Sequence, residues 1–329
     1  MPDSAGSGTV VITARSFSTG SLDLDGRLTR AGLEVVRAAT DHGAEAMREP
    51  LAHAVAWIAG TSPVTGRHLA MARNLRIVAR YGVGVDAVDL AAACTAGVAV
   101  TNTPGANSDA VAEHTCALLL AVLRGVSEGD ARVRRDDWRV IRGRQLQGST
   151  VGVMGFGRIG RATAWRLHAL GCRVIVHDPR VADEVIAAAG FTPVQPGALC
   201  RHADLVCLHA TGGKVLVDSE WVRRASPGQV IVNTGRADLV DEAAIARGLR
   251  SGALSGYAAD MLADEPDARG SLLLDPALEG RVVVTPHLGA QTPQAVDRMG
   301  AMAVDAVLRV LDGQRPENAL VWPGEGTDG

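Results

Sequence analysis

The stretch VGVMGFGRIGRA, residues 151–162, limits the possible folds more than any other part of the chain. Gly155, Gly157 and Gly160 have G-x-G-x-x-G spacing between a strand-like run and the start of a helical stretch. One glycine permits a tight turn, one lets a pyrophosphate approach the backbone, and one lets helix and strand pack closely. Because free N–H groups at a helix N-terminus favour anions, the stretch predicts a dinucleotide-binding strand–turn–helix unit.

Strand-like runs alternate with alanine-rich helical stretches along the whole chain. Strands are predicted from runs rich in β-branched residues, at 9–14, 54–60, 75–80, 98–102, 150–155, 172–178, 203–209, 229–235, 254–260 and 281–286. Helices are predicted between them, and the long one at 108–126 has Ser108 as its expected N-cap. This alternation predicts an α/β fold with doubly wound parallel sheets.

The alternation begins twice, which predicts two domains. The second series carries the glycine turn and predicts a nucleotide-binding domain at residues 103–292. The first series predicts a smaller α/β domain at residues 1–102. The last predicted helix is expected to return to this smaller domain, which then also includes residues 293–329. A chain of 329 residues is long enough to bury two cores.

Composition and charge argue against several classes of partner. Hydrophobic residues make up 47% of the chain and charged residues 21%, as in ordinary globular proteins. The net charge of −3 gives no sign of a nucleic-acid or membrane-surface partner. The one basic cluster, at 131–144, is interpreted as a solvated helix end and loop, with anion binding as the alternative. The longest apolar run, at 116–123, is too short to span a bilayer.

The five cysteines include no C-x-x-C pair, and their number is odd. That pattern fits neither a disulfide framework nor a zinc site, so we predict free thiols, no metal and a cytoplasmic location. The N-terminus has no signal peptide pattern, which agrees with that location.

Asp178 ends the predicted strand that follows the glycine turn. A carboxylate about 20 residues beyond such a turn accepts hydrogen bonds from a ribose 2′-OH and repels a 2′-phosphate. The residue therefore predicts NAD rather than NADP as the cofactor, a preference that the nearby Arg180 softens. The alternative is a fold of this type that binds another nucleotide or none.

Polar side chains follow three of the later predicted strands. Arg236 follows the run 229–235, Asp260 and Glu265 lie at and beyond the end of the next run, and His287 interrupts VVVTPHLGAQT. Because parallel strands deliver their carboxyl ends to one edge, we expect Arg236, Glu265 and His287 to converge. Arginine binds a carboxylate and carbonyl, and histidine transfers a proton. Taken singly, each residue has a simpler interpretation, as an exposed arginine, a helix-capping acid or a histidine in a turn. Taken together, they predict a hydride-transfer site.

At this point the chain resembles a known family, the D-isomer-specific 2-hydroxyacid dehydrogenases. The resemblance covers nearly the whole length and rests on YGVGVDAVD, NTPGANSDAVAEHT, GFGRIG, NTGRADLVDE, DMLADEP and TPHLGAQT, in this order. The stretches VGVD and NTPGANS are most similar to the D-3-phosphoglycerate dehydrogenase branch, in its short form without regulatory domains.

The resemblance implies two Rossmann-like domains with a cleft between them, and a homodimer formed through the nucleotide-binding domains. It implies hydride transfer between nicotinamide C4 and the C2 carbonyl of a small 2-oxo acid. Carried over by motif, His287 is the proton donor, Glu265 is its partner, and Arg236 binds the substrate carboxylate and carbonyl.

Further roles follow from the same resemblance. Arg80 and the backbone of Val83 and Gly84 are implied to bind substrate, and Arg158 to contact the pyrophosphate. The residues implied to bind the cofactor are Gly155, Gly157, Arg158, Ile159, Gly160, Asp178, Thr234 and Asp260.

Two segments depart from the family pattern. The stretch LHATGGKVLVD, at 208–218, is a few residues shorter on the adenosine side of the cofactor. The segment 57–65 lacks the basic residue that helps to hold phosphate in the phosphoglycerate enzymes. The expected substrate is therefore a phosphate- or phosphonate-bearing 2-oxo acid held differently, or a smaller acid such as hydroxypyruvate or glyoxylate. A non-catalytic, NAD-sensing protein of the corepressor type is the alternative from a different functional class.

Overall fold

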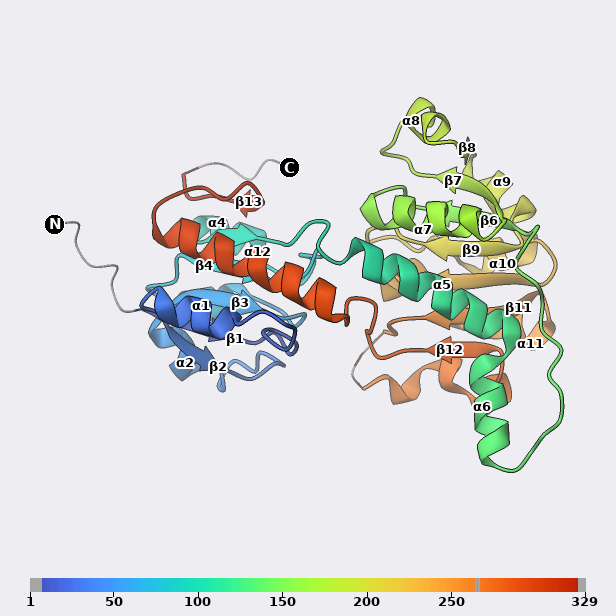
Figure 1. The fold of residues 1–329 in the computed structure, drawn as a ribbon, viewed down its shortest axis with the longest axis horizontal. Coiled ribbons are helices and arrows are strands. Elements are labelled where there is room, and N and C mark those ends of the chain that lie inside the picture. Colours follow the sequence, from blue (N-terminus) through green and yellow to red (C-terminus); the bar gives the residue numbers. More distant parts are fainter. Residues whose placement is uncertain (1–7, 264, 266, 325–329) are drawn as a thin grey trace. The chain divides into compact units, whose positions relative to one another are not determined.

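The computed structural model describes residues 8–263, 265 and 267–324. The chain divides into two compact units. Unit 1 comprises Met1–Asn107 and Gln291–Gly329, and unit 2 comprises Ser108–Ala290. The sequence places the same two divisions at 102/103 and 292/293. Each unit is a mainly parallel sheet covered by helices (Figure 1), which is the predicted α/β class.

Unit 1 contains a six-stranded sheet in the order β13-β5-β4-β3-β1-β2. Its strands are β1 (Thr9–Ile12), β2 (Glu34–Arg37), β3 (Ala54–Ala59), β4 (Ile77–Arg80), β5 (Ala99–Thr101) and β13 (Ala319–Val321). The first five pair in parallel, whereas β13 runs antiparallel to β5. The antiparallel edge strand β13 is not predicted from the sequence, because a three-residue strand next to Pro323 gives no periodic signal.

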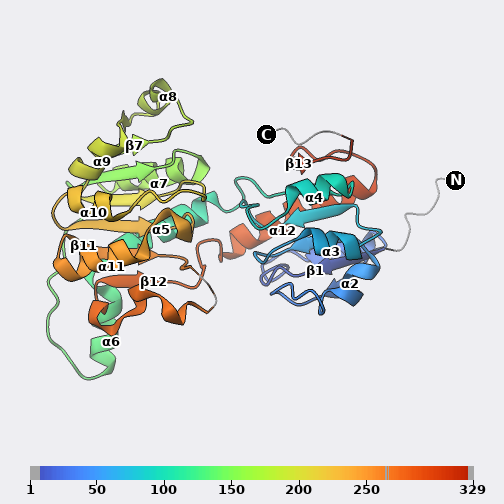
Figure 2. The same ribbon diagram turned by 180° about the vertical axis from the view of Figure 1, so that it is seen from behind.

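Helices cover both faces of the unit 1 sheet. Figure 1 shows α1 (Leu24–Arg30) and α12 (Pro293–Leu311) in front of it. Figure 2, from behind, shows α2 (Arg48–Ala52), α3 (Gly66–Met71) and α4 (Leu90–Thr95). The side chain of Thr292 accepts a hydrogen bond from the Ala295 N–H and so begins α12. The buried stripe of this helix packs on the unit 1 strands β4 and β5.

Unit 2 contains a seven-stranded sheet in the order β12-β11-β10-β9-β6-β7-β8, and every pairing is parallel. Its strands are β6 (Thr150–Met154), β7 (Arg173–His177), β8 (Thr192–Pro193), β9 (Leu205–Leu208), β10 (Gln229–Asn233), β11 (Leu254–Ala259) and β12 (Val282–Val284). The strand order reverses at β6, and such a switch point is where open α/β sheets bind ligands.

The helices of unit 2 lie on both faces of its sheet (Figures 1 and 2). One face carries α5 (Ser108–Arg124) and α7 (Arg158–Ala169), and the other carries α9 (Pro196–His202), α10 (Ser219–Arg224) and α11 (Glu242–Ser251). The short α8 (Asp183–Ala188) lies beside β8, and 3₁₀ turns occupy η1 (Ala237–Leu239), η2 (Ala268–Gly270), η3 (Leu272–Leu274) and η4 (Pro276–Leu278).

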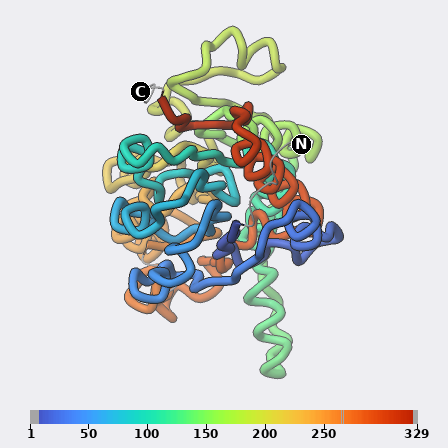
Figure 3. The backbone as a smooth tube through the Cα atoms, turned by 90° about the vertical axis from the view of Figure 1, so that its left-hand side faces the viewer, coloured from blue at the N-terminus to red at the C-terminus, as the bar shows by residue number. Residues whose placement is uncertain are grey.

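The helix α6 (Val126–Arg134) projects beyond the end of α5 in Figure 3. It is bent by 61° from α5. Gly125, with φ of +60°, makes the break. No single helix of the described residues has the length and apolarity to cross a membrane, although α5 and α6 together pass by length and composition.

Ser108 is the first residue of α5 rather than its N-cap. Its buried Oγ makes no hydrogen bond within the described chain, so the capping prediction is wrong. A turn at 104–107 leads directly into the helix, so that residue 108 is already helical, whereas an N-cap residue lies just outside the helix.

Candidate active site

The glycine turn follows β6 and has the shape that a dinucleotide requires. Gly155 has φ of +95°, and a Cβ there would lie 2.6 Å from the carbonyl oxygen of His209. A Cβ at Gly160 would lie 1.9 Å from the carbonyl oxygen of Gly155. A Cβ at Gly157, in contrast, would meet nothing within 4 Å. The fold itself needs two of the glycines, and the third leaves open space where a pyrophosphate approaches the backbone.

The start of α7 lies directly behind this open space. Arg158 is its first residue and is exposed, and Ile159 follows. The first N–H groups of a helix have no partner within the helix, so those of Arg158 and Ile159 are suited to an anion. Asp178, after β7, accepts hydrogen bonds from the Phe156 N–H at 2.7 Å and the Arg180 N–H at 2.8 Å. Through the bond from Phe156, the half-buried carboxylate of Asp178 holds the glycine turn against the end of β7.

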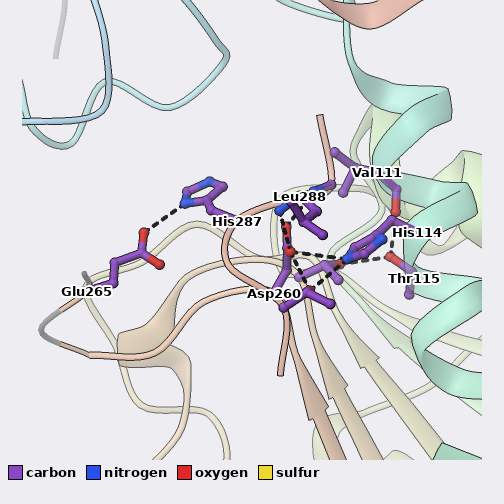
Figure 4. A network of polar contacts seen from close by, with 10 residues as sticks. Val111, His114, Thr115, Asp260, Glu265, His287 and Leu288 are labelled. Carbon is purple, nitrogen blue, oxygen red and sulfur yellow. Dashed lines mark hydrogen bonds and ion pairs between the residues drawn. The ribbon is translucent and has the colours of Figure 1, made fainter. Parts of the chain in front are cut away.

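His287 and Glu265 face each other beyond the ends of β12 and β11 (Figure 4). His287 Nδ1 lies 2.8 Å from Glu265 Oε1, and each side chain is about 40% exposed, at 41% and 39%. Since a carboxylate only accepts hydrogen bonds, Nδ1 carries a proton and Nε2 is the nitrogen left for proton transfer. No other described residue bonds to the ring.

The backbone of His287 is held in an uncommon conformation. Its φ is +58°, in the left-handed region that non-glycine residues seldom occupy. Its N–H donates to the carbonyl oxygen of Asp260 at 2.8 Å. Conformations of this kind persist only where the surroundings enforce them, and they gather at functional sites.

The enforcing group is the carboxylate of Asp260, whose side chain is only 3% exposed. Oδ1 accepts from His114 Nε2 at 3.1 Å, Thr285 Oγ1 at 2.6 Å and the Leu288 N–H at 2.7 Å. Oδ2 accepts from the Gly289 N–H at 2.7 Å. We call Asp260, His114, Thr285 and the turn 285–289 the aspartate clamp. Figure 4 shows Asp260 and His114 on the side of His287 away from Glu265.

These hydrogen bonds also set the charge of Asp260. Burial alone would raise the pKa of its carboxyl group, but the bonds from His114, Thr285, Gly289 and Leu288 together hold that pKa below the ordinary value of 3.8. The carboxylate is therefore ionised near neutral pH and keeps its donors.

Arg236 and Thr234 lie in the tight turn after β10. The buried Asn233 builds that turn: its side chain accepts from the Gly235 N–H at 3.0 Å and donates to the Arg236 carbonyl oxygen at 2.8 Å. The half-buried Arg236 donates from Nη1 to the Gly235 carbonyl oxygen at 2.9 Å. The Thr234 hydroxyl is turned inward, 2.8 Å from Thr115 Oγ1, so its side chain supports the turn.

The implied substrate residues Arg80, Val83 and Gly84 lie in unit 1. Arg80 is the last residue of β4, is 8% exposed, and donates to the carbonyl oxygen of Tyr81. The carbonyl oxygen of Val83 accepts from Asn102 Nδ2 at 2.7 Å. Within the described residues, the N–H groups of Val83 and Gly84 donate no hydrogen bond. Two adjacent free N–H groups are suited to a carboxylate.

Comparisons with known proteins show which family the chain belongs to. A family model described as the NAD binding domain of D-isomer specific 2-hydroxyacid dehydrogenases matches residues 116–289. This chain belongs to that family. A D-3-phosphoglycerate dehydrogenase of Mycobacterium leprae is 40% identical over 271 residues, which are 80% of this chain and 50% of that protein. One from Methanocaldococcus jannaschii is 34% identical over 267 residues, 79% of this chain and 50% of that protein.

A solved structure is similar to this chain over both units. The TT0316 protein of Thermus thermophilus is 34% identical and matches with a TM-score of 0.85 over 95% of this chain and 100% of that one. The chain spans about half the length of the curated relatives it matches.

Two residues beside the site were not predicted from the sequence. His114 lies within the family stretch NTPGANSDAVAEHT and directly precedes buried residues of α5, and this position was the available signal. His209 follows β9, where burial lowers the pKa of its ring to about 4, and its Nδ1 lies 3.4 Å from Thr234 Oγ1.

All five cysteines have free thiols. Among the residues that the structure describes, no three His, Cys, Asp or Glu side chains are grouped to hold a metal ion.

Proposed function

We propose that this chain is an NAD-dependent 2-hydroxyacid dehydrogenase that reduces a small 2-oxo acid. The observation that carries the proposal is the His287–Glu265 pair, 2.8 Å apart, at the same sheet edge as an open glycine turn. A proton-transfer group and a dinucleotide cradle at one edge are what a hydride-transfer enzyme needs.

The residues divide the work of this reaction. Bound NADH supplies a hydride from nicotinamide C4 to the C2 carbonyl carbon. His287 gives the proton at Nε2 to the carbonyl oxygen, so that the alcohol forms, while Glu265 keeps the ring oriented through Nδ1. Arg236 binds the substrate carboxylate and polarises the carbonyl with its planar fork of donors. The aspartate clamp holds His287 in place throughout.

The substrate is proposed to be a 2-oxo acid that bears a phosphate or phosphonate. The similarity to D-3-phosphoglycerate dehydrogenases supports this, with Arg80 as the cation and the N–H groups of Val83 and Gly84 for the carboxylate. Hydroxypyruvate or glyoxylate is the second candidate. The depth of Arg80, 8% exposed and bonded to Tyr81, favours a smaller group.

A homodimer in the cytoplasm is proposed as the form of the enzyme. Support comes from the segment formed by α6 and residues 135–147, which we call the arm. It exposes Trp138 at 74%, beside a hollow of about 270 Å³, and Val140 at 94%. Exposed apolar side chains on a projecting segment are typical of an interface. No nucleic-acid or membrane partner is proposed.

The decisive experiment follows NADH oxidation at 340 nm with 3-phosphohydroxypyruvate, phosphonopyruvate, hydroxypyruvate, glyoxylate and pyruvate, each repeated with NADPH. We expect turnover of at least one acid with NADH, and a preference for the phosphorylated or phosphonylated acids. Turnover of hydroxypyruvate or glyoxylate alone would select the second candidate. Tight NADH binding without turnover of any acid would contradict the enzyme and favour an NAD-sensing protein.

A further inference from the structure

A buried histidine in unit 1 has a hydrogen-bonding pattern that only its neutral form can satisfy. His42 is 3% exposed, with φ of +56°. Its Nε2 lies 2.7 Å from Thr13 Oγ1, and its Nδ1 lies 3.0 Å from the carbonyl oxygen of Pro63. A carbonyl oxygen only accepts, so Nδ1 carries the proton.

The threonine settles the state of the other nitrogen. Thr13 Oγ1 already accepts from Trp57 Nε1 at 3.0 Å and from the Gly60 N–H at 3.2 Å. A hydroxyl accepts two hydrogen bonds and donates one, so its own proton goes to His42 Nε2. A proton on Nε2 would leave three donors facing one oxygen and would bury a charge.

A second histidine is fixed in the same way. His68 Nδ1 accepts from the Thr65 N–H at 3.1 Å, as the side chain of a capping box. Its Nε2 lies 3.0 Å from the carbonyl oxygen of His42, to which it donates. The two rings and Trp57 pack together, with centroids of His42 and Trp57 4.9 Å apart.

These bonds hold the segment 60–65, which leads from β3 to α3, at Gly60, Pro63 and Thr65. That segment in turn pairs with the segment 81–89. The Val64 N–H donates to the Ala87 carbonyl oxygen at 2.7 Å, and the Asp89 N–H donates to the Val64 carbonyl oxygen at 2.9 Å. The segment 81–89 carries Val83 and Gly84.

We propose that neutral His42 is a positioning residue for substrate: it locks segment 60–65, and through it the Val83–Gly84 backbone, and releases them when it is protonated. The inference rests on the proposed function, because it assigns substrate binding to Val83 and Gly84. Acid therefore weakens the affinity of unit 1 for the 2-oxo acid and leaves cofactor binding in unit 2 unchanged.

The surroundings of His42 keep it neutral. Burial is the main cause that lowers the pKa of its ring from the ordinary 6.5, and the nearby His68 and Arg80 lower it further. The Pro63 carbonyl oxygen and Asp41 act in the opposite direction with smaller effect. A proton on His42 would also place a second cation near Arg80.

The test compares wild type with His42→Gln, whose amide oxygen accepts from Thr13 but does not titrate. Because the pKa of His42 is lowered from 6.5, we expect KM of the wild type for the 2-oxo acid to be constant near neutral pH and to rise as pH falls further, towards 4. In His42→Gln this rise should be absent. His53→Gln, which removes an exposed histidine of the same unit, should behave as wild type.

Hydrogen exchange provides a readout that needs no substrate and no variant. Protection of the Gly60, Val64 and Asp89 amides should fall between pH 7.5 and 4, after correction for the intrinsic rate, while that of the Gly155 amide stays constant. Constant protection at all four amides, or the same KM rise in His42→Gln, would overturn the inference. A loss of protection in a protein that reduces no 2-oxo acid would support the lock and contradict only the proposed function.

Discussion

In the glycine turn, one glycine is required by the fold and another is free to serve cofactor binding. Gly160→Ala would place a methyl group against the Gly155 carbonyl oxygen, so we expect unit 2 to lose about 1–3 kcal/mol of unfolding free energy. Gly157→Ala meets no protein atom, and its φ of −70° suits alanine. We expect Gly157→Ala to keep its melting temperature but to raise the Kd for NADH at least about tenfold, or 1.4 kcal/mol. Calorimetry and fluorescence titration measure both. Equal NADH affinity in Gly157→Ala and wild type would contradict the assigned pyrophosphate site.

His287 and Glu265 can be tested as acid and partner. In His287→Asn the asparagine tolerates a φ of +58°, so the fold should remain while kcat falls by about 10²–10⁴-fold. Glu265→Gln keeps a hydrogen-bond acceptor beside Nδ1 but removes the charge, and we expect a smaller loss of kcat. Steady-state kinetics with NADH and the preferred 2-oxo acid measure the two losses. Unchanged NADH affinity is the control, and a His287→Asn enzyme with wild-type kcat would exclude histidine as the acid.

At the scale of elements, the aspartate clamp ties helix α5 to the turn after β12. Asp260→Asn would replace one carboxylate oxygen with an NH₂ group, which donates. If it replaces Oδ2 it faces the Gly289 N–H, and if it replaces Oδ1 it faces donors such as the Leu288 N–H. Two buried donors that face each other lower the free energy of unfolding by about 1–3 kcal/mol. We expect this loss in urea unfolding at pH 7, and a lower kcat because His287 is less firmly held. Wild-type stability in Asp260→Asn would show that the clamp is unimportant.

The clamp also predicts an acid limit for unit 2. The pKa of Asp260 is lower in the folded protein than its ordinary 3.8, so the unfolded chain binds a proton first as pH falls. The stabilisation is therefore complete above that ordinary value and is lost as pH falls through the folded pKa. The difference in unfolding free energy between wild type and Asp260→Asn should shrink below about pH 4, as urea titrations at stepped pH would show. A difference that is constant down to pH 2.5 would contradict an ionised Asp260.

The elements that the sequence predicts well are those with a strong local signal. Buried parallel strands such as β6 and β10 consist of uninterrupted apolar or β-branched runs, and glycine turns and caps mark their ends. The edge strands β2, β8 and β13 escape prediction, because they are two to four residues long and are formed by pairing with a neighbour. In the site, motifs place Arg236, Glu265 and His287 at one edge. The support from His114 depends on a contact with Asp260 that lies 146 positions away.

At the scale of the whole molecule, the two units are assigned different parts of one reaction. In the proposed function, unit 2 contributes the cofactor cradle and the acid, and unit 1 contributes Arg80 and the Val83–Gly84 backbone. This division predicts that variants in unit 1 change the KM for the 2-oxo acid, whereas variants in unit 2 change the affinity for NADH or kcat. Arg80→Ala should raise KM for the 2-oxo acid about tenfold or more and leave the NADH Kd unchanged, because a charge-assisted contact contributes about 1.5–3 kcal/mol. Steady-state kinetics and NADH titration measure the two constants. A change in NADH affinity alone would refute the division.

The arm predicts how copies of the chain associate. Trp138 and Val140 are too exposed to stabilise unit 2 itself, whereas a buried interface aromatic commonly contributes about 2 kcal/mol, or roughly 30-fold in Kd. We expect sedimentation to show a dimer for wild type and a shift to monomer for Trp138→Asp with Val140→Asp, while NADH affinity stays constant. Val185→Asp, an exposed apolar residue on α8 outside the arm, is the matched control and should remain dimeric. If the double variant stays dimeric, the interface lies elsewhere. A monomeric wild type at micromolar concentration would refute the dimer altogether.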